Sequence, residues 1–363
     1  MINSIFPLLR LGLDNSSIEK ESLSDFIVMS VCQWTAVGDL ARKQGVLGIV
    51  LDGADKLQMS KYGATRELSA NLKLEWIGEV LQMEQRNQRQ AKVMEEMAQK
   101  WKQAGCQVMV MKGQANSTFY PHPLHRSPGD IDCYLFGSYK KGNDVAKSTG
   151  ATVNEEWYKH SEIFYKGEVF ENHQFFVHTR SGKRSKRLED ELEKSLKVDE
   201  KQFEPLSLST VMPPVQWVAM FLTYHACGHF LTEGLRLKQI LDWAMFLKAH
   251  QDKVNWNEFY AFCERYHLRR FADAMTAISK DYLGVEITNP EIDVKSDYAD
   301  RILMSTLEDD DYIYSADGGG WKEKLHVIRN LFRYRWKYEE IYQESIWKQL
   351  WYYATGFVFK TEM

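Results

Sequence analysis

The sequence has few cysteines, and no two of them are spaced as a CxxC pair. The five are Cys32, Cys106, Cys133, Cys227 and Cys263. An odd number without paired spacing is not the pattern of a disulfide framework. Scattered thiols in mostly apolar surroundings are typical of reduced core residues, so we expect five free thiols and a cytoplasmic protein.

A strong charge of one sign is also lacking. The chain has 46 basic and 50 acidic residues, which give a formal net charge of -4. No global attraction to nucleic acid or to an anionic membrane is therefore expected. Any contact with nucleic acid would have to be local.

No apolar run is sufficiently free of polar residues to be a membrane span. The longest uncharged stretch, residues 215–231, contains Thr223, His225 and His229. Because such polar groups are unfavourable in a bilayer, the stretch predicts a buried helix, and no membrane partner is expected. Residues 1–13 lack the basic start, the full apolar run and the cleavage site of a signal peptide, so we expect none.

The chain does have an ordinary globular composition, with 44% hydrophobic and 26% charged residues among 363. This length is sufficient for two or three compact units. Helical periodicity runs from Leu72 to Ala104 and returns from Pro213 onward, with strand patterns between them. We predict an α+β protein with an N-terminal helical segment, a small-sheet core and a helical C-terminal domain, over residues 1–70, 71–208 and 209–363.

Four short strand patterns lie in the predicted core. They cover residues 107–111, 129–135, 162–165 and 169–177. The last two are separated by Lys166-Gly167, which has the composition of a hairpin turn. Between the first two, residues 115–120 predict a short helix that ends at the following proline.

Asp130 and Asp132 are two residues apart on the second of these strands, so both side chains project from the same face. Carboxylates in this arrangement can share one or two hard cations. Phosphoryl transfer uses such cations to neutralise charge that develops on the transferred group. An isolated Asp-x-Asp pair is a weak motif, and a solvated strand end is the alternative interpretation.

The surroundings of this pair resemble a known family. Lys112-Gly113, Tyr120-Pro121, Arg126 and Gly129-Asp-Ile-Asp132 occur in the order found in the uncharacterised nucleotidyltransferase family. Residues 170–173 are similar to that family's Glu-x-His strand, and residues 235–242 are similar to a segment of its helical half. Lys112-Gly113-Gln114 stands where the wider polymerase-β-like superfamily usually has a Gly-Gly or Gly-Ser turn.

The resemblance implies a nucleotidyltransferase-like small mixed sheet with flanking helices. It also implies that Asp130 and Asp132 are catalytic residues that hold Mg²⁺, or Mn²⁺, and that Glu171 is the third carboxylate of this metal site. A nucleoside triphosphate such as ATP would be the donor substrate.

Glu171 can complete the metal site if its strand lies antiparallel beside the strand of Asp130 and Asp132. A third acid would also offer a base that activates the attacking group. Glu168 is close by, and either acid has an alternative interpretation as a surface residue of the hairpin. We predict that Glu171 is the third ligand.

Four further residues are predicted to bind phosphate. Gly113 allows close approach of the backbone, and a helix that starts after it would direct free N–H groups at an anion. Lys112 would add positive charge, Arg126 would contact phosphate through two N–H groups, and Ser117 would donate from one turn further on. Each residue has an alternative interpretation. Gly113 would form a plain strand-to-helix turn, Lys112 and Arg126 would be solvated cations, and Ser117 would be an ordinary hydroxyl on a helix face.

Two features of the helical half have both a functional and a structural interpretation. His225 and His229 are four residues apart and share a helix face, as a metal-binding pair would, but without an obvious third ligand we interpret them as core or cleft histidines. Asp242 has Lys238 one turn earlier, so we interpret it as a structural, ion-paired acid.

Two basic segments have both a functional and a structural interpretation. Residues 180–187 can steer a polyanion, or they form a solvated loop. Residues 333–338 interleave cations and aromatic rings as single-strand binders do. At helical spacing, however, such rings more often pack on a core while the cations reach solvent.

The preferred function is metal-dependent transfer of a nucleoside monophosphate from a nucleoside triphosphate to an acceptor, with release of pyrophosphate. Small molecules, protein side chains and RNA ends all remain possible acceptors. One alternative is a metal-dependent glycosyltransferase, although the chain lacks a nucleotide-binding domain ahead of the acids. The other is a catalytically inactive protein that binds a nucleotide or a partner.

Overall fold

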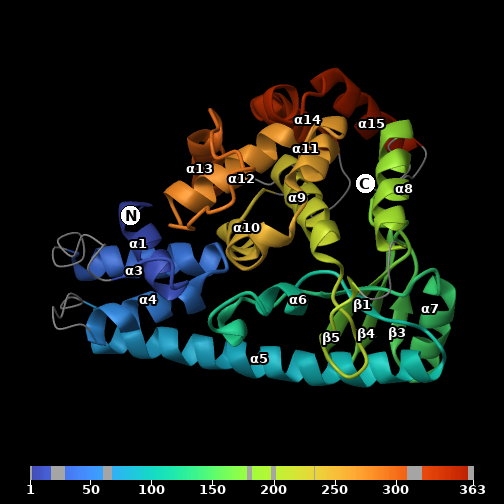
Figure 1. Ribbon diagram of the computed structural model, residues 1–363, viewed down its shortest axis with the longest axis horizontal. Coiled ribbons are helices and arrows are strands. Elements are labelled where there is room, and N and C mark those ends of the chain that lie inside the picture. Colours follow the sequence, from blue (N-terminus) through green and yellow to red (C-terminus); the bar gives the residue numbers. More distant parts are fainter. Residues whose placement is uncertain are drawn as a thin grey trace.

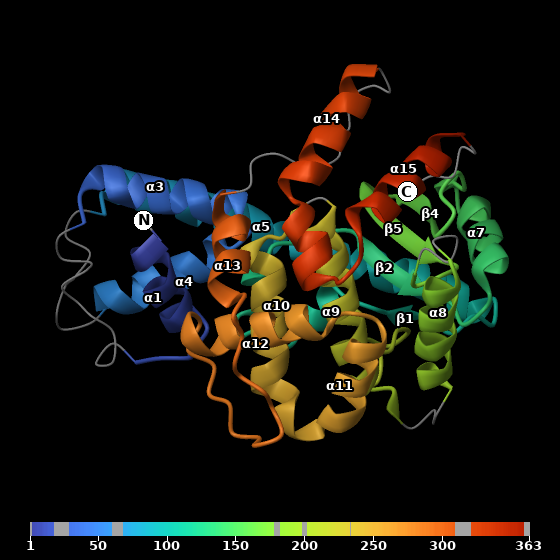
Figure 2. The same ribbon diagram turned by 90° about the horizontal axis from the view of Figure 1, so that it is seen from above.

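A computed structural model of the chain describes residues 2–17, 29–59, 68–177, 182–197, 202–232, 234–308 and 321–358. It contains a small mixed sheet with helices on both sides, which confirms the predicted α+β class (Figures 1 and 2). The division into parts at residues 70 and 208 stays a prediction.

The longest element is helix α5 (Ala70–Gln103), which runs beneath both the N-terminal helices and the sheet (Figure 1). The Ser69 side chain caps its first turn by accepting from the Leu72 N–H. At its other end Gly105 has a φ of 78°, a left-handed conformation that favours glycine after a helix. The predicted span of residues 72–104 is therefore confirmed to within two residues.

Two helices, α3 (Val31–Lys43) and α4 (Leu47–Met59), pack against the first half of α5, and α1 (Ile2–Gly12) packs on α4. The buried rings of Trp34 and Trp76 meet at 6.4 Å between centroids and join α3 to α5. Arg42 of α3 also pairs with two acids of α5, Glu75 and Glu79.

The sheet has five strands in the order β1-β2-β5-β4-β3. The strands are β1 (Met109–Val110), β2 (Ile131–Tyr134), β3 (Thr152–Asn154), β4 (His160–Tyr165) and β5 (Glu168–His173). β2 and β5 are parallel, whereas the other neighbours are antiparallel. The parallel pair is central, and helix α7 (Tyr139–Ser148) with strands β3 and β4 forms the connection between its members.

The two faces of the sheet differ in chemistry because successive side chains alternate along a strand. Ile131, Cys133, Ile163 and Phe170 are buried in one apolar cluster with Trp101 of α5. The intervening residues of β2 and β5 project from the opposite face, which carries the acids. Burial of the apolar face against α5 therefore determines which residues face the site.

Three of the strand predictions were too long. The run at residues 129–135 forms a strand only at Ile131–Tyr134, so Asp130 lies just before the strand and not on it. The run at residues 107–111 forms a strand only at Met109–Val110, where Met109 also bridges Val211. The run that was expected to reach Val177 ends at His173, because Phe176 and Val177 donate their N–H groups to Glu189 instead of a strand. The hairpin turn is confirmed, since Lys166 and Gly167 have φ values of 50° and 82°.

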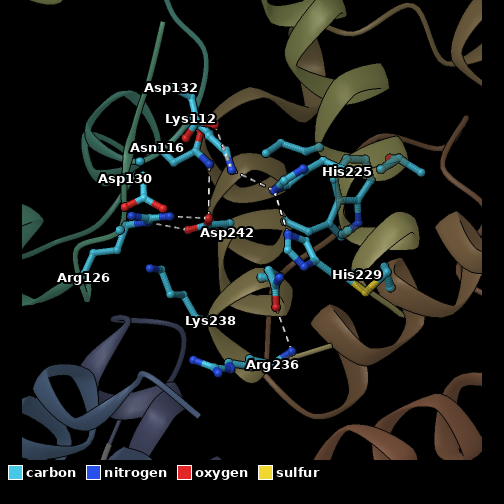
Figure 3. A pocket seen from close by; sticks show the side chains of 18 of the residues that line it. Lys112, Asn116, Arg126, Asp130, Asp132, His225, His229, Arg236, Lys238 and Asp242 are labelled. Carbon is cyan, nitrogen blue, oxygen red and sulfur yellow. Dashed lines mark hydrogen bonds and ion pairs between the residues drawn. The ribbon is translucent and has the colours of Figure 1, made fainter. Parts of the chain in front are cut away.

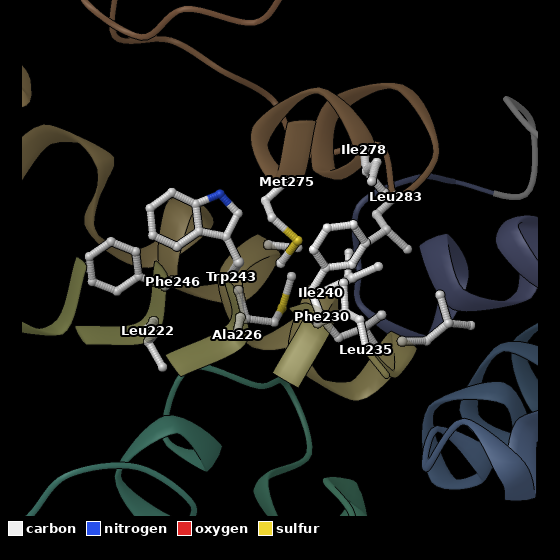
Figure 4. Close-up of a cluster of buried hydrophobic side chains, with 14 of the residues drawn as sticks. Leu222, Ala226, Phe230, Leu235, Ile240, Trp243, Phe246, Met275, Ile278 and Leu283 are labelled. Atoms are coloured by element: carbon white, nitrogen blue, oxygen red, sulfur yellow. The ribbon is translucent and has the colours of Figure 1, made fainter. Parts of the chain in front are cut away.

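Helices cover the acidic face of the sheet. α9 (Val215–Leu231) and α10 (Leu237–His250) pack with α12 (Arg269–Asp281) around an apolar core (Figure 4). The labelled members of this core are Leu222, Ala226, Phe230, Leu235, Ile240, Trp243, Phe246, Met275, Ile278 and Leu283. The predicted buried helix at residues 215–231 is confirmed as α9.

The remaining helices lie around this core and at its far side (Figures 1 and 2). They are α6 (Gln114–Ser117), α8 (Lys183–Leu196), α11 (Trp256–Arg265), α13 (Ala299–Glu308), α14 (Trp321–Arg333) and α15 (Ile346–Val358), with a π-helix at Lys337–Ile341. Among the described helices, none combines the length and the apolar character needed to cross a membrane.

The close contact of α1 with α4 gives a test of this packing. A Cβ at Gly53 of α4 would lie only 2.0 Å from the Leu8 carbonyl oxygen. We expect Gly53→Ala to lower the free energy of unfolding by about 1–3 kcal/mol or more, measured by urea denaturation. Gly78→Ala is the matched control, because nothing lies within 4 Å of its Cβ and alanine stabilises a helix by about 0.5–1 kcal/mol over glycine. Equal effects of the two substitutions would contradict the α1–α4 contact.

Candidate active site

Two carboxylates lie side by side on the parallel strands. Asp132 of β2 is in register with Glu171 of β5, and Asp130 precedes β2 by one residue. The Asp132 side chain is 2% exposed and that of Glu171 is 21% exposed. The structure thus brings Glu171 beside Asp132 as predicted, but the expected antiparallel pairing was wrong, since the connection through α7, β3 and β4 returns β5 in the same direction as β2.

Lys112 balances part of this negative charge. It follows β1, and its Nζ lies 3.1 Å from Asp132 Oδ1 and 3.1 Å from His225 Nε2 (Figure 3). Burial opposes the charge on Lys112, but Asp132 and Glu171 outweigh that effect and raise its pKa. The alternative interpretation of Lys112 as a solvent-exposed residue is therefore wrong, because only 23% of its side chain is exposed.

His173 supplies further positive charge. Its Nε2 lies 3.2 Å from both Asp132 Oδ1 and Glu171 Oε2, and its Nδ1 lies 3.2 Å from the Phe175 carbonyl oxygen. Burial disfavours the imidazolium, yet the two carboxylates raise the pKa of His173. In turn, burial raises the pKa of Glu171, but the His173 contacts outweigh burial and hold it well below its usual range.

The two aspartates differ in their electrostatics. Burial alone would raise the pKa of Asp132, but Lys112 and His173 lower it overall. The pKa of Asp130 is raised, first by partial burial and then by Glu171 and Asp132. Asp130 is therefore the acid whose charged form an added cation would stabilise most.

Arg126 forms a buried ion pair with Asp242. The Nε and Nη2 groups of Arg126 donate to the two carboxylate oxygens of Asp242, each at 2.7 Å. Tyr120 and Asn116 also donate to this carboxylate, at 2.7 and 3.2 Å. Asp242 is thus a paired structural acid, as expected, but Arg126 is its partner, whereas Lys238 Nζ donates to the Pro128 carbonyl oxygen at 3.3 Å. The alternative of a solvated Arg126 is wrong.

The loop ahead of Asp130 is held by helix α5. Asn87 donates to the carbonyl oxygens of Leu124 and Arg126, and Gln90 donates to that of Gly129. These bonds attach the backbone of residues 124–129 to the longest helix of the protein. The position of Asp130 therefore depends on α5.

Gly113 begins the turn between β1 and α6 with a φ of 67°, which favours glycine. Helix α6 has a single turn, so its dipole adds little to anion binding. The Ser117 hydroxyl donates to the Gln114 carbonyl oxygen at 2.7 Å and lines a neighbouring cavity. Phosphate binding by Gly113 and Ser117 stays a prediction.

A pocket of about 370 Å³ opens beside these groups, between the sheet and helices α9 and α10 (Figure 3). The predicted residues Lys112, Gly113, Arg126, Asp130 and Asp132 all line it. Its opposite wall carries further polar residues, which are His225, His229, Arg236 and Lys238. Both walls of the pocket therefore carry basic side chains, and Asp130 and Asp132 lie on the side of the sheet.

The histidines of α9 are cleft residues of this pocket. His225 Nε2 lies 3.1 Å from His229 Nε2 and 3.1 Å from Lys112 Nζ, so one nitrogen makes both contacts. Burial and the nearby Lys112 cation lower the pKa of His225 well below its usual value. The interpretation as cleft histidines fits this chain of contacts.

Lys238 was not recognised as a pocket residue from the sequence. Burial, followed by the Arg126 cation, lowers its pKa to about 7. An anion in the pocket would favour the charged form of this amine. The sequence places Lys238 one turn before Asp242, but only the fold shows that both residues face the pocket.

Glu168 does not join the acids, and its interpretation as a surface residue was also wrong. Its side chain is 1% exposed and accepts hydrogen bonds from Arg89 and Gln90 of α5. The basic segment was expected to be a loop, but its described part, residues 182–187, belongs to α8 and its N-cap. Arg180 lies outside the described residues.

The aromatic and basic segment at residues 333–338 packs on the helical core. Lys337 is buried over the rings of Phe230 and Tyr334. The Tyr338 hydroxyl donates to the Leu231 carbonyl oxygen at 2.6 Å. This arrangement agrees with the structural interpretation of the segment.

The five cysteines are unpaired in the structure. Cys106, Cys133, Cys227 and Cys263 are buried, as expected of core thiols, whereas Cys32 is exposed. The prediction of a core position was therefore wrong for Cys32, which lies in the first turn of α3.

Comparison with protein families gives a match over more than half of the chain. Residues 30–284 match the model of a family described as "Uncharacterised nucleotidyltransferase". This span includes α5, the whole sheet and helices α9 to α12, and the chain belongs to that family. No curated protein and no solved structure matches the sequence significantly.

The buried pair of Arg126 and Asp242 can be tested by its effect on stability. We expect Arg126→Met to lower the free energy of unfolding by about 3–5 kcal/mol, because it leaves a buried carboxylate without its cation. The double variant Arg126→Met/Asp242→Leu should recover part of this loss, since no unpaired charge is then buried, while Tyr120 and Asn116 still lose their acceptor. Urea denaturation measures all three proteins, and a single-variant loss below about 0.5 kcal/mol, as for an exposed pair, would contradict the pairing.

Proposed function

We propose that the protein transfers a nucleoside monophosphate from a nucleoside triphosphate to an acceptor in a metal-dependent reaction. The observation that supports this most is the convergence of Asp130, Asp132, Lys112 and Gly113 at one pocket. Membership of the nucleotidyltransferase family supports the same reaction class. The acceptor is proposed to enter the pocket from the side of α9 and α10.

Asp130, Asp132 and Glu171 would hold the divalent cation. Their donor atoms are carboxylate oxygens, which suit Mg²⁺ or Mn²⁺. Partial burial, followed by the neighbouring Glu171 and Asp132, raises the pKa of Asp130, so a cation would favour its charged form. When bound, the cation would neutralise charge on the phosphates and on the transferred group.

Basic side chains of the protein would neutralise the remaining negative charge of the triphosphate. Lys112 lies next to Asp132, and Arg236 and Lys238 line the opposite wall. An arriving polyanion would favour the charged form of Lys238, whose pKa is otherwise about 7. Cations on both walls would hold the phosphates in one orientation relative to the acceptor.

Glu171 is better suited to hold a cation than to act as a base. Its pKa lies well below its usual range because His173 contacts outweigh burial. A carboxylate of such low basicity accepts a proton poorly at neutral pH. Activation of the acceptor would then depend on the cation and on orientation rather than on Glu171 as a proton acceptor.

The proposal is tested first by ligand-dependent stability and product release. A nucleoside triphosphate with Mg²⁺ or Mn²⁺ should raise the melting temperature, because ligands that bind only the native state stabilise it. Pyrophosphate should be released when an acceptor is present. Sugar-nucleotide hydrolysis would favour a glycosyltransferase instead, binding without turnover would favour an inactive nucleotide-binding protein, and no response to any triphosphate would contradict a nucleotide site.

The two aspartates should respond differently to substitution. Asp130→Asn should leave the metal-free stability unchanged or slightly higher, because it removes one of three repelling charges. Asp132→Asn should lower it by about 1–3 kcal/mol, because Lys112 and His173 lose their shared anion. Both variants should lose the stabilisation by metal and nucleotide, as measured by thermal shift.

Asp144→Asn is the control for these substitutions. Asp144 is an exposed acid on α7, so the same change of charge should leave nucleotide binding intact. If both Asp130→Asn and Asp132→Asn bind nucleotide and turn over normally, the proposed site is wrong.

A further inference from the structure

A group of imidazoles lies beside the acids on the same face of the sheet. His160 of β4 is in register with His173 of β5, and Glu162 is in register with Glu171. Directly paired residues of antiparallel strands point to the same face. One ligand atom from each of His160, Glu171 and His173 lies within 4.8 Å of the others.

The orientation of His173 is that of a metal ligand. Its Nδ1 lies 3.2 Å from the Phe175 carbonyl oxygen, a position in which Nδ1 carries the proton and donates it. The second nitrogen, Nε2, lies 3.2 Å from Glu171 Oε2 and from Asp132 Oδ1, and a metal ion bound there would take the place of its proton. Metal-binding histidines are commonly fixed in this way, with one nitrogen bonded to a backbone carbonyl and the other directed at the ion.

His160 provides an independent observation. Its Nδ1 is buried without a hydrogen-bond partner among the described residues. Its Nε2 lies 3.7 Å from Glu171 Oε1, which is longer than a hydrogen bond. Its ring packs on Trp157 and on His173 and is therefore held in place. Among the described residues, neither ring nitrogen of this half-buried imidazole makes a hydrogen bond, although Nε2 faces a carboxylate.

We propose that His160, Glu171 and His173 bind a divalent transition-metal ion such as Co²⁺ or Zn²⁺. Two imidazoles and one carboxylate form a mixed nitrogen and oxygen donor set, which such ions prefer, whereas Mg²⁺ prefers oxygen donors alone. Glu162 adds negative charge on the same face of the neighbouring strand.

This site adjoins the one proposed for nucleotide transfer and shares Glu171 with it. The inference thus deepens the proposed function, on which its catalytic relevance rests, while the binding of the ion itself can be measured without nucleotide. A transition metal bound between Glu171 and the two histidines would leave Asp130 available to bind the cation that accompanies the nucleotide in the pocket. The expected consequence is a preference of the whole site for transition metals over Mg²⁺.

The test is titration of the full-length, metal-stripped protein with Co²⁺. Binding is followed by calorimetry and by visible absorption, which reports the ligands and geometry of Co²⁺. His160→Phe keeps a planar ring and should reduce Co²⁺ affinity by at least about 100-fold, since loss of even an outer partner of a metal site costs 10–100-fold. His173→Gln should do the same, and the melting temperature of each metal-free variant shows that it folds.

His122→Phe is the matched control, because His122 is an exposed histidine outside this group. It should bind Co²⁺ like the unmodified chain, and a large excess of Mg²⁺ should displace little Co²⁺. Equal Co²⁺ affinity of His160→Phe and the unmodified chain, or full displacement of Co²⁺ by Mg²⁺, would overturn the inference.

Asp130→Asn separates this inference from the proposed function. It should lose stabilisation by Mg²⁺ and nucleotide but keep Co²⁺ affinity within a few-fold. If nucleotide never binds while Co²⁺ binds through His160, the proposed function fails and the metal site stands. If nucleotide binds with Mg²⁺ and His160→Phe changes nothing, the metal site fails and the proposed function stands.

Discussion

The repulsion between Asp132 and Glu171 constrains the rest of the site. These acids are in register on neighbouring parallel strands and are largely shielded from water. Two buried like charges are costly unless cations face them. Lys112 and His173 provide that charge within the protein, and each lies within 3.2 Å of Asp132. The site is therefore held together by charge balance, and a bound metal ion would strengthen that balance.

Positioning of these groups depends on contacts far from the acids. Helix α5 buries the apolar face of the sheet and also binds the backbone of residues 124–129 through Asn87 and Gln90. The pair of Arg126 and Asp242 joins that same loop to α10 on the other side of the pocket. The loop before Asp130 is thus fixed from below and from above, so that the pocket is formed before any ligand enters it.

Local patterns in the sequence predicted the elements of the fold better than their arrangement. The period of α5, the hairpin turn at Lys166-Gly167 and the buried helix α9 each depend on residues close in sequence, and each was confirmed. The parallel pairing of β2 with β5 and the ion pair of Arg126 with Asp242 join residues about 40 and 116 positions apart. Periodicity carries no information on such pairings, so they were missed or assigned to the wrong partner.

The histidines beside the acids were nevertheless within reach of the sequence. A two-residue turn at Lys166-Gly167 pairs Tyr165 with Glu168, and counting back along both strands pairs His160 with His173. Because side chains alternate with a period of two, both histidines then share the face of Glu171. Counting cannot show that β5 lies beside β2, which depends on the long connection through α7. The hairpin defines the imidazole and carboxylate group, and its parallel neighbour β2 then places that group against Asp132.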